Sequence, residues 1–451
     1  MKNKLIIGIA ILVTSALLVG CSLPLTPSEM IKPPMMGLKE EEVKKAAEQF
    51  MPKGAKYTVP NQSVKTGSFV QIDLNNDGTD EVAVFYKDQN SIGMLLLQQS
   101  GSKWQLKDQI TGYGNNIDYA GFYDMNGDKQ LEVLFGGEGY GQDKKLIIYK
   151  LAGEKYKEFC RLDYASFSVG DLGGDGKLEI ASILRINEII PVVKLQVFSL
   201  GDKALQQDYK TKFENGGFPE QVLIGAAAKG LQGIFVDMGV GAHSAVTELL
   251  IKENGVFKNV LNERQTFKPY SLPSKDVNND GIVEIGMLIA PPKTEELSVA
   301  GIPWVNNWYQ WNGTSGLMAE PVMEEYSNYL EGYQLIIPEN WRGKYTINKE
   351  ADENSKVDSI HFIFLPAEKK KAELLALYHI PKEEWQKLEA KWQNSNQAFV
   401  VIGENSRNML VAKLPQNNAE LSGDQLKEYQ EMLLNKENIK KYFVEITPLV
   451  P

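Results

Sequence analysis

An acidic segment that recurs along the chain decides the fold. It reads DLNNDGTDEVAV at residues 73–84, DMNGDKQLEVLF at 124–135, DLGGDGKLEIAS at 171–182 and DVNNDGIVEIGM at 276–287. The starts of these copies lie 51, 47 and 105 residues apart, and the last spacing is close to two periods. A degenerate copy is therefore expected inside that interval, where GAAAKGLQGIF at 225–235 keeps the glycine and the apolar residues without any carboxylate. Self-similarity at a nearly fixed period indicates a repeat architecture.

Each period has the pattern of four short strands. In the first period, strands are expected at residues 68–72, 81–86, 93–97 and 103–106. The strand after the acidic loop is an almost unbroken apolar run, which is typical of a strand buried on both faces. Four strands in a repeat of roughly 50 residues make one propeller blade. We therefore predict a mainly β chain whose residues 66–328 form a β-propeller-like array of about five four-stranded blades. An unrelated β-sandwich with acidic turns is the alternative.

The segments outside the repeats predict further parts of the chain. Residues 1–20 have a basic start and an apolar run, as a secretory signal peptide does. Residues 21–37 are rich in proline, which favours an extended tether, and residues 38–65 begin with the spacing of a helical lead-in. Residues 329–451 read as a small α+β C-terminal domain. Its strands are expected at 333–337, 344–347, 359–365, 398–403 and 409–414, and its helices at 382–392 and 423–443.

Cys21 comes directly after the apolar run, in the sequence LVGCS at residues 18–22. This sequence resembles the bacterial lipobox, whose cysteine thiol receives diacylglycerol before cleavage makes it the new N-terminus. The resemblance implies a lipoprotein carrying acyl chains such as palmitate, anchored at the extracytoplasmic face of the cell membrane. Cys160 is the second of two cysteines and would then have no intrachain partner, so we expect a buried thiol. An ordinary signal peptide with an incidental cysteine is the alternative.

The repeated loop carries oxygen-bearing side chains at positions one, three, five and nine, and usually glycine at position six. With the backbone carbonyl of position seven, these oxygens can converge on one hard cation if position six allows a sharp turn. Calcium fits best because it accepts about six to eight oxygen ligands in irregular geometry. Position twelve holds Val84, Phe135, Ser182 or Met287, which excludes the bidentate glutamate of an EF-hand. Alternatively, the Asp and Asn residues only close turns between strands.

The repeats resemble the FG-GAP and VCBS-type calcium loops of integrin-like β-propellers, over roughly residues 66–325. The resemblance implies structural calcium, with complete sites in the first and last acidic loops. It implies weaker sites in the second loop, where Lys129 replaces the glycine, and in the third, where Gly173 replaces a ligand. The implied ligands are Asp73, Asn75, Asp77, Thr79 (carbonyl) and Glu81; Asp124, Asn126, Asp128 and Glu132; Asp171, Asp175 and Glu179; and Asp276, Asn278, Asp280, Ile282 (carbonyl) and Glu284.

Composition and motifs favour a binding protein over an enzyme. The formal net charge of −10 argues against nucleic acid as a partner. The chain has three histidines, and we find no nucleophile-elbow, zinc-protease, phosphate-loop or dinucleotide motif. We therefore expect a monomeric binding or scaffold module of the cell envelope, whose partner is an envelope protein or a glycan. Two carboxylates suffice for a glycosidase, so an exported glycosidase is one alternative, and a purely structural accessory lipoprotein is another.

A partner-binding face is expected at the strand ends opposite the acidic loops. Successive antiparallel strands reverse the chain, so the loop after each apolar strand lies at that opposite end. Tyr140, His243 and Trp304 lie there in or beside glycine-containing segments. Such loops on a rigid scaffold often bind ligands. Glycine-rich strand connections with a tryptophan covering a sheet edge are the alternative.

Overall fold

The computed structural model describes residues 40–447, apart from 66, 142, 187–191, 214–216, 262, 353–356, 366–371 and 416–420. The predicted signal peptide, Cys21 and the tether lie outside these residues. The chain forms two compact units, one ending at Leu162 and the other continuing from Asp163, except that residues 124–128 belong to the second unit. Within the described segments, no helix is both long enough and apolar enough to cross a membrane.

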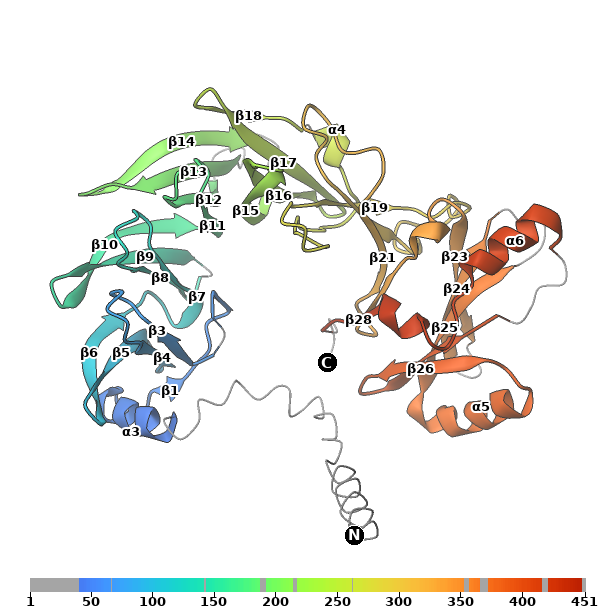
Figure 1. Cartoon of the computed structure of the whole chain (residues 1–451), viewed down its shortest axis with the longest axis horizontal. Helices are drawn as coiled ribbons and strands as arrows, with labels where there is room; N and C mark the ends of the chain where they lie inside the picture. Colours follow the sequence, from blue (N-terminus) through green and yellow to red (C-terminus); the bar gives the residue numbers. More distant parts are fainter. Residues whose placement is uncertain are drawn as a thin grey trace, which may run out of the picture. The chain divides into compact units, whose positions relative to one another are not determined.

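Among the described residues of the first unit, helix α3 (Glu40–Phe50) lies beside two sheets (Figure 1). Helix α3 packs through Val43 and Ala47 against the first sheet. That sheet contains β1 (Lys56–Tyr57), β3 (Phe69–Ile72), β4 (Glu81–Lys87), β5 (Ile92–Ser100) and β6 (Lys103–Thr111). The second sheet contains β7 (Asn116–Tyr123), β8 (Glu132–Glu138), β9 (Lys144–Ala152) and β10 (Lys155–Tyr164), with β2 (Gln62–Ser63) added parallel to β7.

The second unit continues the series of sheets. The third sheet contains β11 (Ser166–Gly170), β12 (Glu179–Ile186), β13 (Val192–Leu200) and β14 (Leu205–Phe213). The fourth contains β15 (Phe218–Ala228), β16 (Leu231–Gly241), β17 (Ser244–Glu253) and β18 (Val256–Asn259), and the short helix α4 (Glu263–Thr266) follows it. The fifth contains β19 (Ile285–Ile289), β20 (Val305–Tyr309), β21 (Met323–Asn328), β22 (Tyr333–Ile336) and β28 (Phe443–Glu445).

These sheets confirm the predicted fold class. The chain is mainly β, and each of the five sheets has a core of four antiparallel strands that follow one another in the sequence, as in a propeller blade. Strand β4 shows why its sequence is an unbroken apolar run. Val82 and Val84 pack toward α3, whereas Ala83 and Phe85 pack toward the second sheet, so both faces of the strand are buried.

Equivalent positions of successive loops are joined by backbone hydrogen bonds. The N–H of Leu131, at position eight of the second loop, donates to the carbonyl of Leu74, at position two of the first. The N–H of Leu178 donates to Met125 in the same way. The N–H of Val283, at position eight of the last acidic loop, donates to the carbonyl of Ala226, at position two of the degenerate copy. The degenerate copy therefore occupies the structural place of a loop.

The degenerate copy forms a tight turn in place of an acidic loop. Ala228 of β15 pairs with Leu231 of β16, so two residues connect the strands. Gly230 has φ +73°, a left-handed conformation that glycine adopts at little cost. The fourth sheet thus keeps the blade topology without the carboxylates.

The C-terminal sheet consists of β23 (Tyr345–Asp352), β24 (Val357–Phe364), β25 (Glu373–Pro381), β27 (Asn408–Lys413) and β26 (Phe399–Glu404) in that spatial order. Helices α5 (Lys382–Asn394) and α6 (Gly423–Met432) accompany it. The predicted strand at 333–337 instead appears as β22, which pairs with β21. The fifth sheet therefore continues past the boundary expected at residue 328.

The helix predicted over 423–443 was too long. Helix α6 ends at Met432, and Leu433 has extended backbone. The side chain of Asn435 then accepts hydrogen bonds from the N–H groups of Glu437 and Asn438. Such side-chain-to-backbone bonds compete with helical ones. The chain consequently turns into the short helix η2 (Ile439–Tyr442) and then β28.

Candidate metal centre

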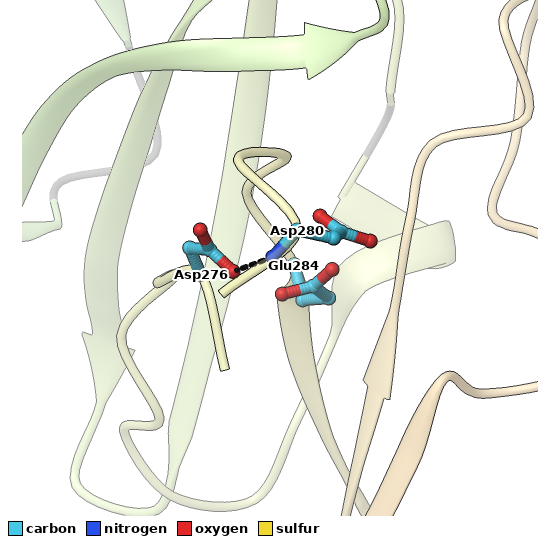
Figure 2. A group of neighbouring side chains, drawn as sticks. All are labelled: Asp276, Asp280 and Glu284. Carbon is cyan, nitrogen blue, oxygen red and sulfur yellow. Dashed lines mark hydrogen bonds between the residues drawn. The ribbon is translucent and has the colours of Figure 1, made fainter. Parts of the chain in front are cut away.

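The last acidic loop brings three carboxylates together directly before β19 (Figure 2). One oxygen each of Asp276, Asp280 and Glu284 lies within 4.8 Å of the other two. Within the described part of the chain, no other group of three His, Cys, Asp or Glu side chains has this spacing. The sequence prediction placed these three residues in one site, and the structure brings them together.

Backbone N–H groups fold this loop around its own side chains. The N–H of Asp280 donates to Asp276 Oδ1 (3.2 Å), as Figure 2 shows, and the N–H of Gly281 donates to Asp276 Oδ2 (2.9 Å). Asn278 Oδ1 also accepts from Asp280 N–H (3.0 Å), and Asp280 Oδ1 accepts from Ile282 N–H (2.8 Å). Gly281 has φ +84°, so glycine at position six permits the sharp turn.

Two carboxyl groups of this loop, buried Glu284 and exposed Asp280, have pKa values shifted in opposite directions. Glu284 is fully buried, and burial raises its pKa. Burial also acts to raise the pKa of Asp280, but hydrogen bonds from Ile282 N–H and from the Asn278 and Gln310 side chains outweigh it, so the pKa of Asp280 is lowered. The three carboxylates form an all-oxygen donor set, to which the sequence motif adds the Asn278 amide oxygen and the Ile282 carbonyl as expected ligands. That set fits calcium, which prefers oxygen ligands, and offers no thiol or imidazole for zinc.

Gln310 belongs to the candidate site, although the loop motif does not include it. Its Nε2 donates to both Asp280 Oδ2 and Glu284 Oε1, each at 2.8 Å. It stands opposite Glu284 across the β19–β20 pair, since the neighbouring residues Ile285 and Tyr309 are partners. Strand register brings Gln310 to Glu284 although the two residues are 26 positions apart. The loop motif, which covers only neighbouring residues, does not show this relationship.

The first acidic loop has the same backbone pattern. The N–H of Gly78 donates to Asp73 Oδ2 (2.9 Å), and the N–H of Thr79 donates to Asp77 Oδ1 (2.8 Å). Hydrogen bonds from the Asn75 side chain and from Thr79 N–H lower the pKa of Asp77. Glu81, at position nine of the first loop, has a different side-chain partner from Glu284.

Glu81 is paired with a lysine. Lys107 Nζ lies 2.6 Å from Glu81 Oε1, while Glu81 Oε2 accepts from Leu74 N–H. The side chains of Lys107 and Glu81 are only 11% and 4% exposed. A positive charge on strand β6 therefore lies beside the first loop, which the sequence motif did not predict.

The second loop is divided between the two units: Asp124, Asn126 and Asp128 belong to one and Glu132 to the other. Asp124 Oδ1 accepts from the N–H groups of Gly127 (2.7 Å) and Asp128 (3.0 Å). Lys129 has φ +69°, a left-handed conformation that the other acidic loops give to glycine. Glu132 is buried and lies 3.7 Å from Lys150 Nζ.

The third loop lacks a ligand at position three. Asp171 accepts N–H bonds from Gly176 (2.8 Å) and from its neighbours in the loop, which lower its pKa. A Cβ on Gly173 would lie 3.5 Å from Asp175 Oδ1, so a side chain at this position would point into the loop. Burial raises the pKa of Glu179. The third loop thus keeps the backbone fold of the other acidic loops but has one candidate ligand oxygen fewer.

Each residue predicted for the partner-binding face has its own local contact. Tyr140, in the first unit, is 80% exposed, and its hydroxyl donates to the Gln89 carbonyl. In the second unit, exposed His243 meets the ring of Tyr270 edge-on, and Trp304 Nε1 donates to the Val299 carbonyl.

Comparison with known proteins gives only distant structural matches. No family model and no curated protein matches the sequence. A protein from Lactobacillus plantarum aligns with 10% identity over 65% of this chain and 80% of its own, with a TM-score of 0.31. Sqt1 from Saccharomyces cerevisiae aligns with 10% identity over 67% and 83%, with a TM-score of 0.31. A rhamnogalacturonan lyase from Bacillus licheniformis aligns with 13% identity over 65% and 72%, with a TM-score of 0.29. These similarities assign no function to the chain.

Proposed function

We propose that the chain is a calcium-stabilised binding module of the cell envelope, anchored to the membrane through a lipid on Cys21. The observation that carries the calcium part is the convergence of Asp276, Asp280 and Glu284 in a loop folded by its own backbone. In this proposal, Asn278 and the Ile282 carbonyl complete the oxygen set. Calcium neutralises carboxylates that would otherwise repel one another, and its role is structural.

The binding part of the proposal concerns the strand ends opposite the acidic loops. At such strand ends, exposed Tyr140 of the first unit offers an aromatic face, and exposed His243 of the second unit offers polar ring atoms. Each group by itself suits a glycan or a protein surface. The test is capture of purified cell-wall glycans and of solubilised envelope proteins by the immobilised chain. Capture that falls with Tyr140→Ala or His243→Ala, at an unchanged melting temperature, supports the proposal. Undiminished capture by both variants contradicts the assignment of this face.

A second candidate function, hydrolysis, is raised by one arrangement of polar groups in the C-terminal sheet. Ser359 Oγ lies 2.9 Å from His361 Nε2, and His361 Nδ1 lies 2.6 Å from Glu373 Oε2. This order of groups is that of a nucleophile, a base and an orienting carboxylate. However, Ser359 is only 5% exposed, and Glu350 Oε2 also lies 3.5 Å from His361 Nε2. Burial and a second carboxylate suit a packed polar cluster better than a nucleophile.

A fluorophosphonate probe distinguishes these two roles. If Ser359 is a nucleophile, its Oγ forms a bond to phosphorus, fluoride leaves, and His361 takes the hydroxyl proton. A packed polar cluster predicts no labelling of the native chain. Chromogenic glycosides, which test the glycosidase alternative, should remain intact in the same experiment. Labelling that Ser359→Ala abolishes would establish the hydrolase instead.

A further inference from the structure

The ninth residue of an acidic loop is always a buried or half-buried glutamate, but its side-chain partner differs between loops. In the fifth sheet, Glu284 receives the neutral amide of Gln310. In the first sheet, Glu81 receives the ammonium group of Lys107. Glu132 of the second sheet likewise lies near an ammonium group, that of Lys150. The loops therefore differ in the charge placed beside the same ligand.

Lys107 satisfies the electrostatic need that a metal ion would meet. Its Nζ lies 2.6 Å from Glu81 Oε1 inside a largely buried pair. A divalent ion held by the same carboxylate would lie within a few ångströms of this ammonium group. Like charges repel strongly at such a separation in a largely buried site, and a divalent ion doubles the repulsion that a monovalent ion would meet. Metal binding at this loop therefore has to displace Lys107 or overcome the repulsion.

Gln310 has the opposite effect in the last acidic loop, which leads into the fifth sheet and is called the fifth loop below. Its amide contributes no net charge, and its two 2.8 Å bonds hold Asp280 and Glu284 side by side. The carboxylates thus stay close together with only a neutral amide beside them. This is the arrangement that a divalent ion stabilises most.

We propose that Lys107 is a built-in counter-ion that makes the first loop independent of calcium, and that Gln310 marks the fifth loop as the calcium-dependent one. The inference rests on the proposed function, because it concerns which loop takes the ion. The two loops with the complete motif therefore differ in type: Lys107 neutralises the first loop, whereas the fifth loop requires a metal ion. The chain consequently binds one calcium ion at these two loops, although its sequence contains two complete motifs.

Calorimetric calcium titration of the full chain in detergent, with reciprocal exchanges, tests this inference. Gln310→Lys should weaken calcium binding at least tenfold and leave the chain folded in chelator. Lys107→Gln should raise the stoichiometry by one and make the melting temperature of the first unit sensitive to chelator. Asp276→Asn and Asp73→Asn locate the native site: the first should remove the bound calcium, and the second should leave it.

The outcomes separate the two proposals. A wild-type chain that binds no calcium overturns the proposed function. A wild-type chain whose calcium is lost in Asp73→Asn, or whose binding is unchanged in a folded Gln310→Lys variant, keeps the calcium function but overturns the assignment of the loops. If Lys107→Gln fails to fold, the two aspartate variants still decide where the ion binds. Unchanged stoichiometry in a folded Lys107→Gln variant contradicts the role of Lys107.

Discussion

The hydroxyl of Tyr333 lies 3.0 Å from Nε2 of His379, which joins the fifth sheet to the C-terminal sheet. Both side chains are buried. Burial lowers the pKa of His379 although Glu331 and Asp358 act to raise it. The imidazole is therefore held neutral in the folded chain, and its protonation favours unfolding.

This pairing predicts that His379 contributes a loss of stability in mild acid. A base whose pKa is lower when folded leaves the unfolded state with more bound protons, so the free energy of unfolding falls as the pH drops below the unfolded value of about 6.5. The slope approaches about 1.4 kcal/mol per pH unit for one such group. Urea midpoints at neutral pH and at roughly pH 5 measure it. His379→Gln should flatten this dependence, whereas the same change at exposed His243 should not. An equal slope in the wild type and His379→Gln would remove His379 from the explanation.

A buried polar cluster between the fourth and fifth sheets predicts a large loss of stability on mutation. Asp237 accepts bonds from Ser274 N–H (2.8 Å), Ser274 Oγ (3.0 Å) and the Thr247 hydroxyl, and Lys268 Nζ lies 3.9 Å away. All four side chains are at most 2% exposed. Asp237→Ala leaves Lys268 buried without its counter-ion and should cost about 3 kcal/mol or more. Asp208→Ala on exposed β14 is the matched control and should change the free energy of unfolding by less than about 0.5 kcal/mol. Equal values for the two variants would contradict a stabilising role of the cluster.

The second and fifth loops make opposite predictions about position six. Lys129 (φ +69°) adopts the left-handed conformation that Gly281 (φ +84°) adopts freely. For a residue with a side chain this conformation costs roughly 1–2 kcal/mol, and the added freedom of glycine in the unfolded chain offsets up to about 1 kcal/mol. Lys129→Gly should therefore stabilise the chain by about 0.5–1 kcal/mol, and Gly281→Ala should destabilise it by about 1 kcal/mol. Urea unfolding checks both signs, and destabilisation by Lys129→Gly would show that its side chain matters more than its backbone.

The lipobox predicts where the chain resides in the cell. Diacylation of Cys21 supplies two acyl chains, which suffice for stable membrane residence. Cys21→Ala should move the protein from the membrane fraction to the soluble one and abolish incorporation of labelled palmitate. Cys160→Ala is the control, because Cys160 is half-buried and burial raises its pKa to about 12. Membrane retention of Cys21→Ala, with no fatty acid in the wild type, would exclude the anchor.

The repeat period and the loop motif predicted the sheets and the local folding of the acidic loops. Both depend on residues close in the sequence, such as Asp276 and the N–H of Gly281. The partners of the ninth residue could not be predicted in this way. Lys107 and Gln310 are each 26 residues from their glutamates, and they are brought there by strand register. Strand β28 could not be predicted for the same reason, because its three residues pair with β22, which is distant in the sequence.

The calcium dependence of unfolding tests the central claim most directly. An ion that binds only the folded chain, with a dissociation constant of roughly 10⁻⁴ to 10⁻³ M as in extracellular modules, stabilises it by about 1.4–2.7 kcal/mol at roughly 10 mM calcium. Urea unfolding of the wild type in calcium and in chelator should show this difference, and Asp276→Asn should abolish it. Identical unfolding curves of the wild type with calcium and with chelator would contradict the account.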